Sequence, residues 1–303
     1  MSAVRVANAP LSYGAFEMTV GTGFPVPEPE RVLEAIAGAG YAGTDLGPPG
    51  YLGEGDALAE RLAANGLDVV GGFVPMRFSE REHWAQGLDG LHHTLDLFEA
   101  ARAAGARPVL CDAGGPDRLA HPGRGWEDPS LRLDDGRWRT LAEGVARAAD
   151  AARERGFDAV FHHHTSTYVE GVPEIERFLE DTDVPLLLDT GHLAVAGGDP
   201  VAALHDWSDR ICAIHVKDVR LDVLQSVKAD SADTLSAWRR GLFCALGDGD
   251  VDLDGVCTAL AASAYEGWVV VEQDRVLEDG ASFADASAEQ ARNRDWLREH
   301  AGW

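Results

Sequence analysis

Eight short apolar segments alternate with helical segments along this sequence, and this alternation constrains the fold more than any other feature. When a helix separates two such strands, the strands run parallel. Because these crossovers are right-handed and the unit is repeated eight times, the pattern predicts a single (β/α)8 TIM barrel over residues 1–303. A doubly wound open sheet is the alternative. Its nucleotide-binding versions are disfavoured, since no GxGxxG turn follows the first strand and no P-loop motif occurs.

Gly and Pro residues separate most of the predicted elements. The strands are expected at residues 5–10, 41–46, 68–74, 108–111, 158–162, 185–189, 211–216 and 267–272. The helices that follow them are expected at 29–39, 56–65, 91–104, 139–155, 172–179, 200–207, 234–240 and 286–300, with an extra helix at 253–262. Residues 112–138 form a long connection rich in Gly, Pro and Asp. Connections of this length are often functional, and we expect this one to be a lid over the active site.

The charge balance limits the partners of the protein. Lys and Arg total 26 against 51 Asp and Glu, a net charge of −25, which disfavours nucleic acid and anionic membranes. No signal-peptide pattern and no run of about 18 apolar residues occurs, so we expect a soluble, cytoplasmic protein. The four cysteines form no CxxC pair and are expected to be reduced, buried thiols.

Potential metal ligands stand where four of the predicted strands end. The apolar run 186–188 is followed by Asp189, and His162, His215 and Glu272 stand at or near the ends of three other strands. In a barrel, the C-terminal ends of all strands meet at one face. Any one of these residues could be a helix cap or a hydrogen-bonded core residue, but the joint pattern predicts a divalent metal site. Carboxylate and imidazole ligands suit Mn²⁺, Co²⁺, Fe²⁺ or Zn²⁺ better than Ca²⁺.

At these positions the chain resembles the xylose-isomerase-like TIM-barrel sugar phosphate isomerase/epimerase superfamily, and within it the inosose dehydratase-like branch. The resemblance extends over nearly the whole chain. It is carried by the motifs at residues 8–14 (NAPLSYG), 43–51 (GTDLGPPGY), 72–75 (GFVP), 162–167 (HHHTST), 189–192 (DTGH), 215–218 (HVKD), 246–252 (LGDGDVD) and 272–274 (EQD).

The resemblance implies a divalent metal, with Mn²⁺ or Co²⁺ favoured and Zn²⁺ possible, and no nucleotide cofactor. Carried over by position, the metal ligands would be His162, Asp189, His215 and Glu272. Catalytic roles fall to Glu272, His192 and Lys217, and substrate contacts to His164, Asn8, Ser12 and Arg275. Whether His162 or His164 is the ligand on strand five is left open, and His163 is expected to point away from the barrel interior because strand side chains alternate.

One departure from the family pattern bears on the reaction. The isomerases usually carry a glutamate where this chain has His162, and two metal-bound glutamates exchange protons on opposite faces of the substrate. A single carboxylate, Glu272, suits elimination, which needs one base and one acid. We therefore expect a dehydratase that removes water from an inosose or related polyhydroxy ketone through an enediolate. Glu272 and His192 are the candidate base and acid, in either order.

Several alternatives stay open at this point. The barrel could be a ketose isomerase or epimerase, or a sugar-binding protein without activity. Lys217, one of only two lysines, could stabilise an enolate oxygen or form a structural ion pair with Asp218 or Asp189. Asp274 and Arg275 could orient the metal ligands. We expect a small polyol or sugar as substrate, and a homo-oligomer is possible.

Overall fold

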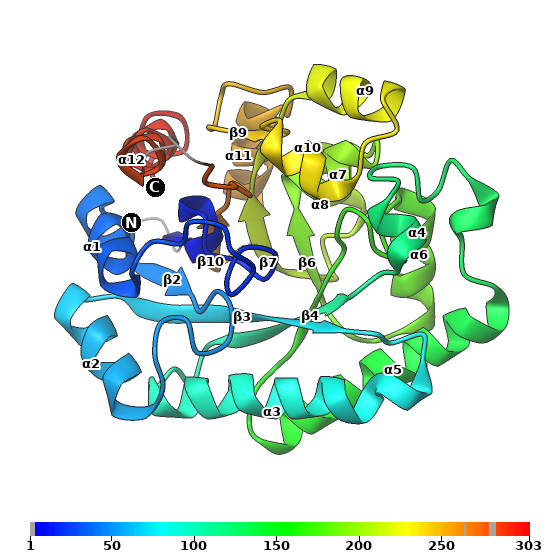
Figure 1. The fold of residues 1–303 in the computed structure, drawn as a ribbon, viewed down its shortest axis with the longest axis horizontal. Coiled ribbons are helices and arrows are strands. Elements are labelled where there is room, and N and C mark those ends of the chain that lie inside the picture. The colour runs from blue at the N-terminus through cyan, green and yellow to red at the C-terminus, as the bar shows by residue number, and fades with distance from the viewer. Residues whose placement is uncertain (1–3, 264, 279–282) are drawn as a thin grey trace.

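The computed structural model describes residues 4–263, 265–278 and 283–303 and is a closed barrel of eight parallel strands (Figure 1). Around the barrel the strands follow the order β1, β10, β7, β6, β5, β4, β3, β2. This confirms the predicted (β/α)8 barrel, and closure rules out the open doubly wound sheet. The strands are β1 (Val4–Asn8), β2 (Gly43–Asp45), β3 (Asp68–Met76), β4 (Arg107–Asp112), β5 (Val160–His162), β6 (Leu186–Asp189), β7 (Ile211–Val216) and β10 (Gly267–Val271).

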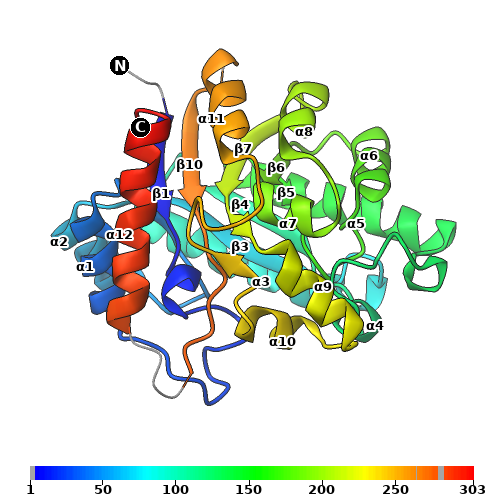
Figure 2. The same cartoon turned by 90° about the horizontal axis from the view of Figure 1, so that it is seen from above.

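Helices surround the barrel on the outside (Figures 1 and 2). The outer ring consists of α1 (Pro29–Ala39), α2 (Gly55–Asn65), α3 (Trp84–Ala100), α5 (Asp135–Glu154), α6 (Val172–Asp181), α8 (Pro200–Asp206), α11 (Leu253–Ala262) and α12 (Phe283–His300). Helix α5 begins four residues before the predicted start, because the Asp134 carboxylate caps it by accepting from the Arg137 amide.

The assignment of the seventh helix was wrong. We expected residues 234–240 to follow strand seven in the ring and 253–262 to be the extra helix. In the structure α11 packs against α8 in the ring, whereas α10 (Thr234–Arg239) packs against α9 (Leu221–Ala229) (Figure 2). Sequence periodicity identifies both helices as amphipathic, but it does not say which apolar face meets the barrel.

Several short elements were missed because long-range contacts hold them. The antiparallel pair β8 (Asp218–Val219) and β9 (Phe243–Cys244) lies beyond β7. Asp218 organises the adjoining loop, since its carboxylate accepts from the amides of Gly247, Gly249 and Val251. The other short elements are η1 (Pro10–Tyr13), η2 (Arg81–His83), α4 (Pro116–Leu119), η3 (Pro129–Leu131) and α7 (Thr190–Val195).

The main core lies between the barrel and the helices. Phe161 of β5 packs outward, where its ring stacks on Phe178 of α6 with centroids 4.1 Å apart. Small and aliphatic side chains such as Val109, Val160 and Leu187 pack together in a separate cluster. Burying this apolar surface supplies most of the driving force for folding.

The segment predicted as a lid is fastened to the barrel by a buried ion network. Arg118 of α4 is fully buried, and it pairs with Glu174 of α6 and lies 3.5 Å from Glu170. Glu170 also accepts from the amides of Gly123 and Gly125. Residues 113–134 are therefore tied to the connection after β5. That this segment opens as a lid stays a prediction.

We expect Arg118→Ala to destabilise the protein by about 3–5 kcal/mol, because it leaves two buried carboxylates without their cation. Thermal and urea unfolding of the variant should show this loss. Arg153→Ala is the control, since Arg153 forms an exposed ion pair with Asp150 and its removal should cost no more than about 1 kcal/mol. Equal effects of the two substitutions would contradict a structural role for the Arg118 network.

No helix in the described part of the chain is long and apolar enough to cross a membrane. The four cysteines are free thiols, as expected. Cys111, Cys244 and Cys257 are buried, whereas Cys212 on β7 is only half-buried, so the expectation of burial is correct for three of the four.

Candidate metal centre and active site

Strand alternation brings the four predicted ligands to one place. Each proposed ligand lies two residues after a small or aliphatic residue of its own strand. The pairs are Val160 and His162 on β5, Leu187 and Asp189 on β6, Ala213 and His215 on β7, and Val270 of β10 with Glu272 directly after it. Residues two apart on a strand share a face. Asp189 pairs with His215 in register, and Val270 pairs with His215 on the other side. The sequence therefore places all four side chains inside the barrel mouth.

The ligand atoms of three of these residues converge. One atom each from His162, Asp189 and His215 lies within 4.8 Å of the other two. His215 Nδ1 is 3.7 Å from Asp189 Oδ2 and 3.1 Å from Glu272 Oε2. All four side chains are at least nine-tenths buried. The structure thus brings together the predicted ligand set, and the assignment of these residues to a metal stays a proposal.

The donor atoms at this point suit a divalent cation. Asp189 Oδ2 and His215 Nδ1 are buried and make no hydrogen bond of good geometry within the described residues, and their charged neighbours are Lys217 Nζ at 3.3 Å and Glu272 Oε2 at 3.1 Å. Buried polar atoms are rarely left unpaired in native proteins, and both atoms have lone pairs that can bind a cation. Burial lowers the pKa of His215, but the carboxylates of Glu272 and Asp189 outweigh it and raise the pKa overall. A cation bound there would take the place of that proton.

Lys217 is buried among the carboxylates. Its Nζ lies 3.3 Å from Asp189 Oδ2, 3.2 Å from Glu272 Oε2 and 2.8 Å from Asp274 Oδ2. Burial disfavours the ammonium, but the three carboxylates together raise the pKa of Lys217, so it stays protonated. One ammonium among three carboxylates leaves an excess of negative charge, which favours a further cation.

Gly191 explains how Lys217 reaches this position. A Cβ at Gly191 would lie 2.8 Å from Lys217 Cγ, closer than packed carbon atoms approach each other. Thr190 fixes the lysine backbone, since its hydroxyl donates to the Lys217 carbonyl and accepts from the Lys217 amide. The ion pair with Asp189 is present, whereas the carboxylate of Asp218 is bonded to backbone amides instead.

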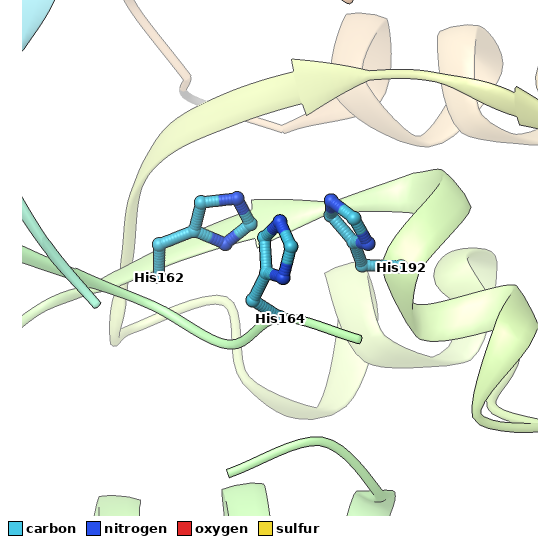
Figure 3. Close-up of side chains that lie close together, drawn as sticks. All are labelled: His162, His164 and His192. Carbon is cyan, nitrogen blue, oxygen red and sulfur yellow. The ribbon is translucent and has the colours of Figure 1, made fainter. Parts of the chain in front are cut away.

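Three imidazoles lie side by side next to this centre, with His164 between His162 and His192 (Figure 3). The His164 and His192 ring centroids are 3.7 Å apart. His192 Nε2 lies 2.9 Å from Lys217 Nζ and accepts from it, and Nδ1 lies 2.9 Å from Thr165 Oγ1 and 3.4 Å from the Thr165 amide nitrogen. Both nitrogens of His192 are therefore engaged.

His164 Nε2 makes no hydrogen bond within the part of the chain that the structure describes. His164 Nδ1 is 2.7 Å from the Thr165 carbonyl, which can only accept, so Nδ1 carries the hydrogen and Nε2 carries the lone pair. Burial lowers the pKa of His164 to about 4, and the ring is neutral at pH 7. His164 is only partly buried, and it lines the pocket described next.

A pocket opens over three of the four proposed metal ligands, His162, His215 and Glu272, at the C-terminal ends of the strands, whereas Asp189 does not line it. Its floor contains Asp45, His162, His215, Glu272 and Asp274. Its walls come from the connection after β5, from α10 and from the segment after β4, and include His164, Thr165, Thr234, Trp238, Asp112 and Leu119. Side chains of both the predicted lid and α10 therefore lie against any ligand in the pocket.

Not every predicted site residue lines this pocket. His192 and Lys217 lie behind its floor. Asn8 donates to Gln290, Ser12 accepts from the Gln273 amide, and Arg275 pairs with Glu289, so these three hold the floor from outside. Their roles as substrate contacts stay predictions that this geometry does not favour.

His163 points away from the centre as expected, but it is fully buried. Its Nε2 accepts from the Asp189 amide at 3.2 Å and so supports the strand that carries that ligand.

Three carboxylates that line the pocket were not selected from the sequence, namely Asp45, Asp112 and Glu17, which stands in the loop after η1. Asp45 and Asp112 are the last residues of β2 and β4 and line the pocket. Burial raises the pKa of each to about 6. The criterion that selected Asp189, an acid at a strand end, would have found both aspartates.

Comparison of the amino-acid sequence with known protein families gives the same fold. A family model described as xylose isomerase-like TIM barrel matches residues 33–300. The chain belongs to this family. An inosose dehydratase of Geobacillus kaustophilus (strain HTA426) is 34% identical to this member over 250 residues, which cover 81% of this chain and 80% of that protein. The predicted superfamily and its dehydratase-like branch are thereby confirmed.

Solved structures of the xylose isomerase-like fold superpose along the full chain. An L-ribulose 3-epimerase has a TM-score of 0.68 at 18% identity and covers 100% of this chain and 95% of its own. The IOLI protein, solved with a bound zinc atom, has a TM-score of 0.67 at 14% identity and covers 98% of this chain and 99% of its own. At these identities the likeness establishes the shared barrel.

Proposed function

We propose that this protein is a divalent-metal-dependent dehydratase that removes water from an inosose or a related polyhydroxy ketone. The observation that carries the proposal is the pairing of His162 on β5 with a single glutamate, Glu272, after β10. Proton exchange on both faces of a substrate would need a second glutamate carboxylate, which this centre does not have. Elimination does not need that second carboxylate. The inosose dehydratase relative, similar over most of both chains, supports the same reaction.

His162, Asp189, His215 and Glu272 would hold the metal, and their mixed nitrogen and oxygen donors suit Mn²⁺ or Co²⁺, with Zn²⁺ as the alternative. A bound ion of this kind polarises a ketone oxygen and makes the adjacent C–H bond more acidic. Asp189 is oriented for this role, because its Oδ1 accepts from the amides of Gly191 and His192 while Oδ2 faces the other ligands.

His164 is our candidate for the base. Its Nε2 lone pair has no partner among the residues that the structure describes, its ring is neutral, and it lines the pocket, whereas Glu272 is engaged by His215 and Lys217. His164 Nε2 would take the proton from the carbon next to the ketone. The electron pair of that C–H bond forms the new C=C bond, and the C–O bond of the β-hydroxyl breaks.

Lys217 stays protonated among its three carboxylates, so its role is to hold Asp274 at the pocket by a hydrogen bond. The proton that His164 has taken passes to the departing hydroxyl, which leaves as water, so that His164 serves as base and then as acid. His192 positions Lys217 by accepting from Nζ. In this scheme His192 acts through Lys217 and makes no direct contact with the substrate. Cytoplasmic location and homo-oligomer formation stay predictions.

Incubation of the Mn²⁺-loaded protein with 2-keto-myo-inositol tests the proposed function. We expect loss of one water molecule per turnover, seen by mass spectrometry, together with a new ultraviolet-absorbing dione. The reaction is repeated in D₂O with a panel of ketoses. Deuterium incorporation without loss of water would instead establish an isomerase or epimerase, and binding without any turnover would establish a sugar-binding barrel.

A further inference from the structure

Asp112 is a buried carboxylate at the pocket that the proposed chemistry does not use. It is the last residue of β4, pairs in register with Met76 of β3, and is 2% exposed. Asp112 is one of the residues that line the pocket, and it stands at the start of the segment predicted as a lid. It lies at the end of a different strand from each proposed metal ligand, so it can act on a part of the substrate away from the metal.

The two oxygens of Asp112 have different surroundings. Oδ1 accepts from the amide of Gly114 at 2.8 Å and from the amide of Tyr168 at 3.1 Å. These bonds fix the side chain between the connections after β4 and β5. Oδ2 is buried and has no hydrogen-bond partner among the described residues. Because a buried carboxylate oxygen without a partner is costly, this atom requires a donor.

A purely structural role accounts for only half of this geometry. The Asp112–Gly114 bond is an Asx turn, which holds the start of the connection and uses Oδ1 alone. Arg118 and Arg137 are the cations that act electrostatically on Asp112, but their hydrogen bonds go elsewhere. Arg118 donates to Leu131 and Glu174, and Arg137 to Ser79 and Glu80. Neither arginine satisfies Oδ2.

We propose that Asp112 Oδ2 accepts a hydrogen bond from a hydroxyl group of the polyol substrate and thereby contributes to substrate specificity. The inference rests on the proposed function in one respect, namely that the ligand is a polyhydroxy compound. A polyhydroxy ligand carries hydroxyl groups around its whole ring, so a hydrogen-bond donor can face Asp112 whichever way the ring is bound. A carboxylate fixed by two amides is preorganised to bind one of them, since little side-chain freedom is lost on binding.

Asp112→Asn tests this inference. The Asn side chain can keep the Oδ1 bonds to both amides but has an NH₂ group in place of Oδ2. Loss of a hydrogen bond to a charged acceptor should raise the Kd for myo-inositol, measured by calorimetry on Mn²⁺-loaded protein, by about 10- to 100-fold. Myo-inositol lacks the ketone, so the proposed elimination does not consume it. Metal content should match that of the wild type, and KM for 2-keto-myo-inositol should rise more than kcat falls.

Mono-deoxy analogues of myo-inositol identify the bonded hydroxyl. One analogue should bind the wild type about as weakly as the parent compound binds Asp112→Asn, and it should lose little further affinity in the variant. Asp112→Ala separates the structural role, because it also removes the Oδ1 bonds and should lower Tm more than Asp112→Asn does. Unchanged Kd and KM in Asp112→Asn would overturn the inference and leave Asp112 as a loop-holding residue.

The outcomes also separate this inference from the proposed function. A wild type that binds myo-inositol but does not dehydrate the inosose would overturn the proposed reaction, while weaker binding by Asp112→Asn would still support the Asp112 contact. A wild type that dehydrates the inosose with the same KM as Asp112→Asn would support the reaction and overturn the contact. A wild type that binds and converts no polyol would overturn both.

Discussion

Asp189→Asn is expected to abolish divalent-metal binding and to lower kcat/KM for 2-keto-myo-inositol by at least about 100-fold, the upper end of what loss of a residue behind a metal ligand produces. The Asn side chain can keep the Oδ1 bonds to the amides of Gly191 and His192. It replaces Oδ2 with an NH₂ group, which cannot bind a cation and which would face the ammonium of Lys217, 3.3 Å from Oδ2.

Metal content by mass spectrometry and steady-state kinetics measure this effect. Asp199→Asn is a matched control, because Asp199 also caps a helix and accepts from two amides, those of Val201 and Ala202, but is exposed and does not line the pocket. The control should keep its metal and its activity. Full metal content in Asp189→Asn would mean that the four strand ends do not form the metal centre.

Replacement of the two candidate histidines of strand five should have different effects. His164→Asn is expected to lower kcat by about 10²- to 10⁴-fold with normal metal content, the range typical of losing a general base. His162→Asn is expected to lower the metal content itself. The difference follows from position, since His162 lies beside the carboxylate of Asp189 and the ring of His215, whereas His164 lies beside the rings of His162 and His192 and its Nε2 has no hydrogen-bond partner among the described residues.

Both variants are analysed in the same preparation for metal content, for kcat and for Tm. Metal loss in His164→Asn together with normal metal in His162→Asn would exchange the two assignments. Normal kcat in His164→Asn would remove this residue from the proton transfer and return the role of base to Glu272.

The barrel was predictable because its determinants are local. Each strand is a short apolar run, and each helix shows the periodicity of an amphipathic helix. A closed barrel surrounded by helices is one of the few arrangements in which eight such strands are all buried on both faces. The positions of Asp189 and His215 follow from the same pattern, since the ends of parallel strands meet at one face. An acid or imidazole placed there by the sequence must lie near the others, whatever the loops do.

The arrangement around these strand ends was less predictable. Sequence reasoning suggested an ion pair for Lys217 with Asp189 or Asp218, but the loop at 247–251 takes the Asp218 carboxylate, and Asp274 takes its place beside the lysine. Likewise, Asn8 and Arg275 stand next to strand ends in the sequence, yet both bond to residues of α12. Adjacency in sequence does not determine which side of a strand end a side chain occupies once the chain leaves the sheet.

The barrel, the family and the four strand-end groups of the proposed metal centre could therefore be predicted from the amino-acid sequence. Three features could not: that His164 rather than His192 opens on the pocket, that Arg118 fastens the segment after β4, and that α11 rather than α10 belongs to the ring. The difference lies in the range of the interactions. Strand and helix periodicities act between neighbours in the chain, whereas these three features depend on hydrogen bonds and packing between segments that only the closed barrel brings together.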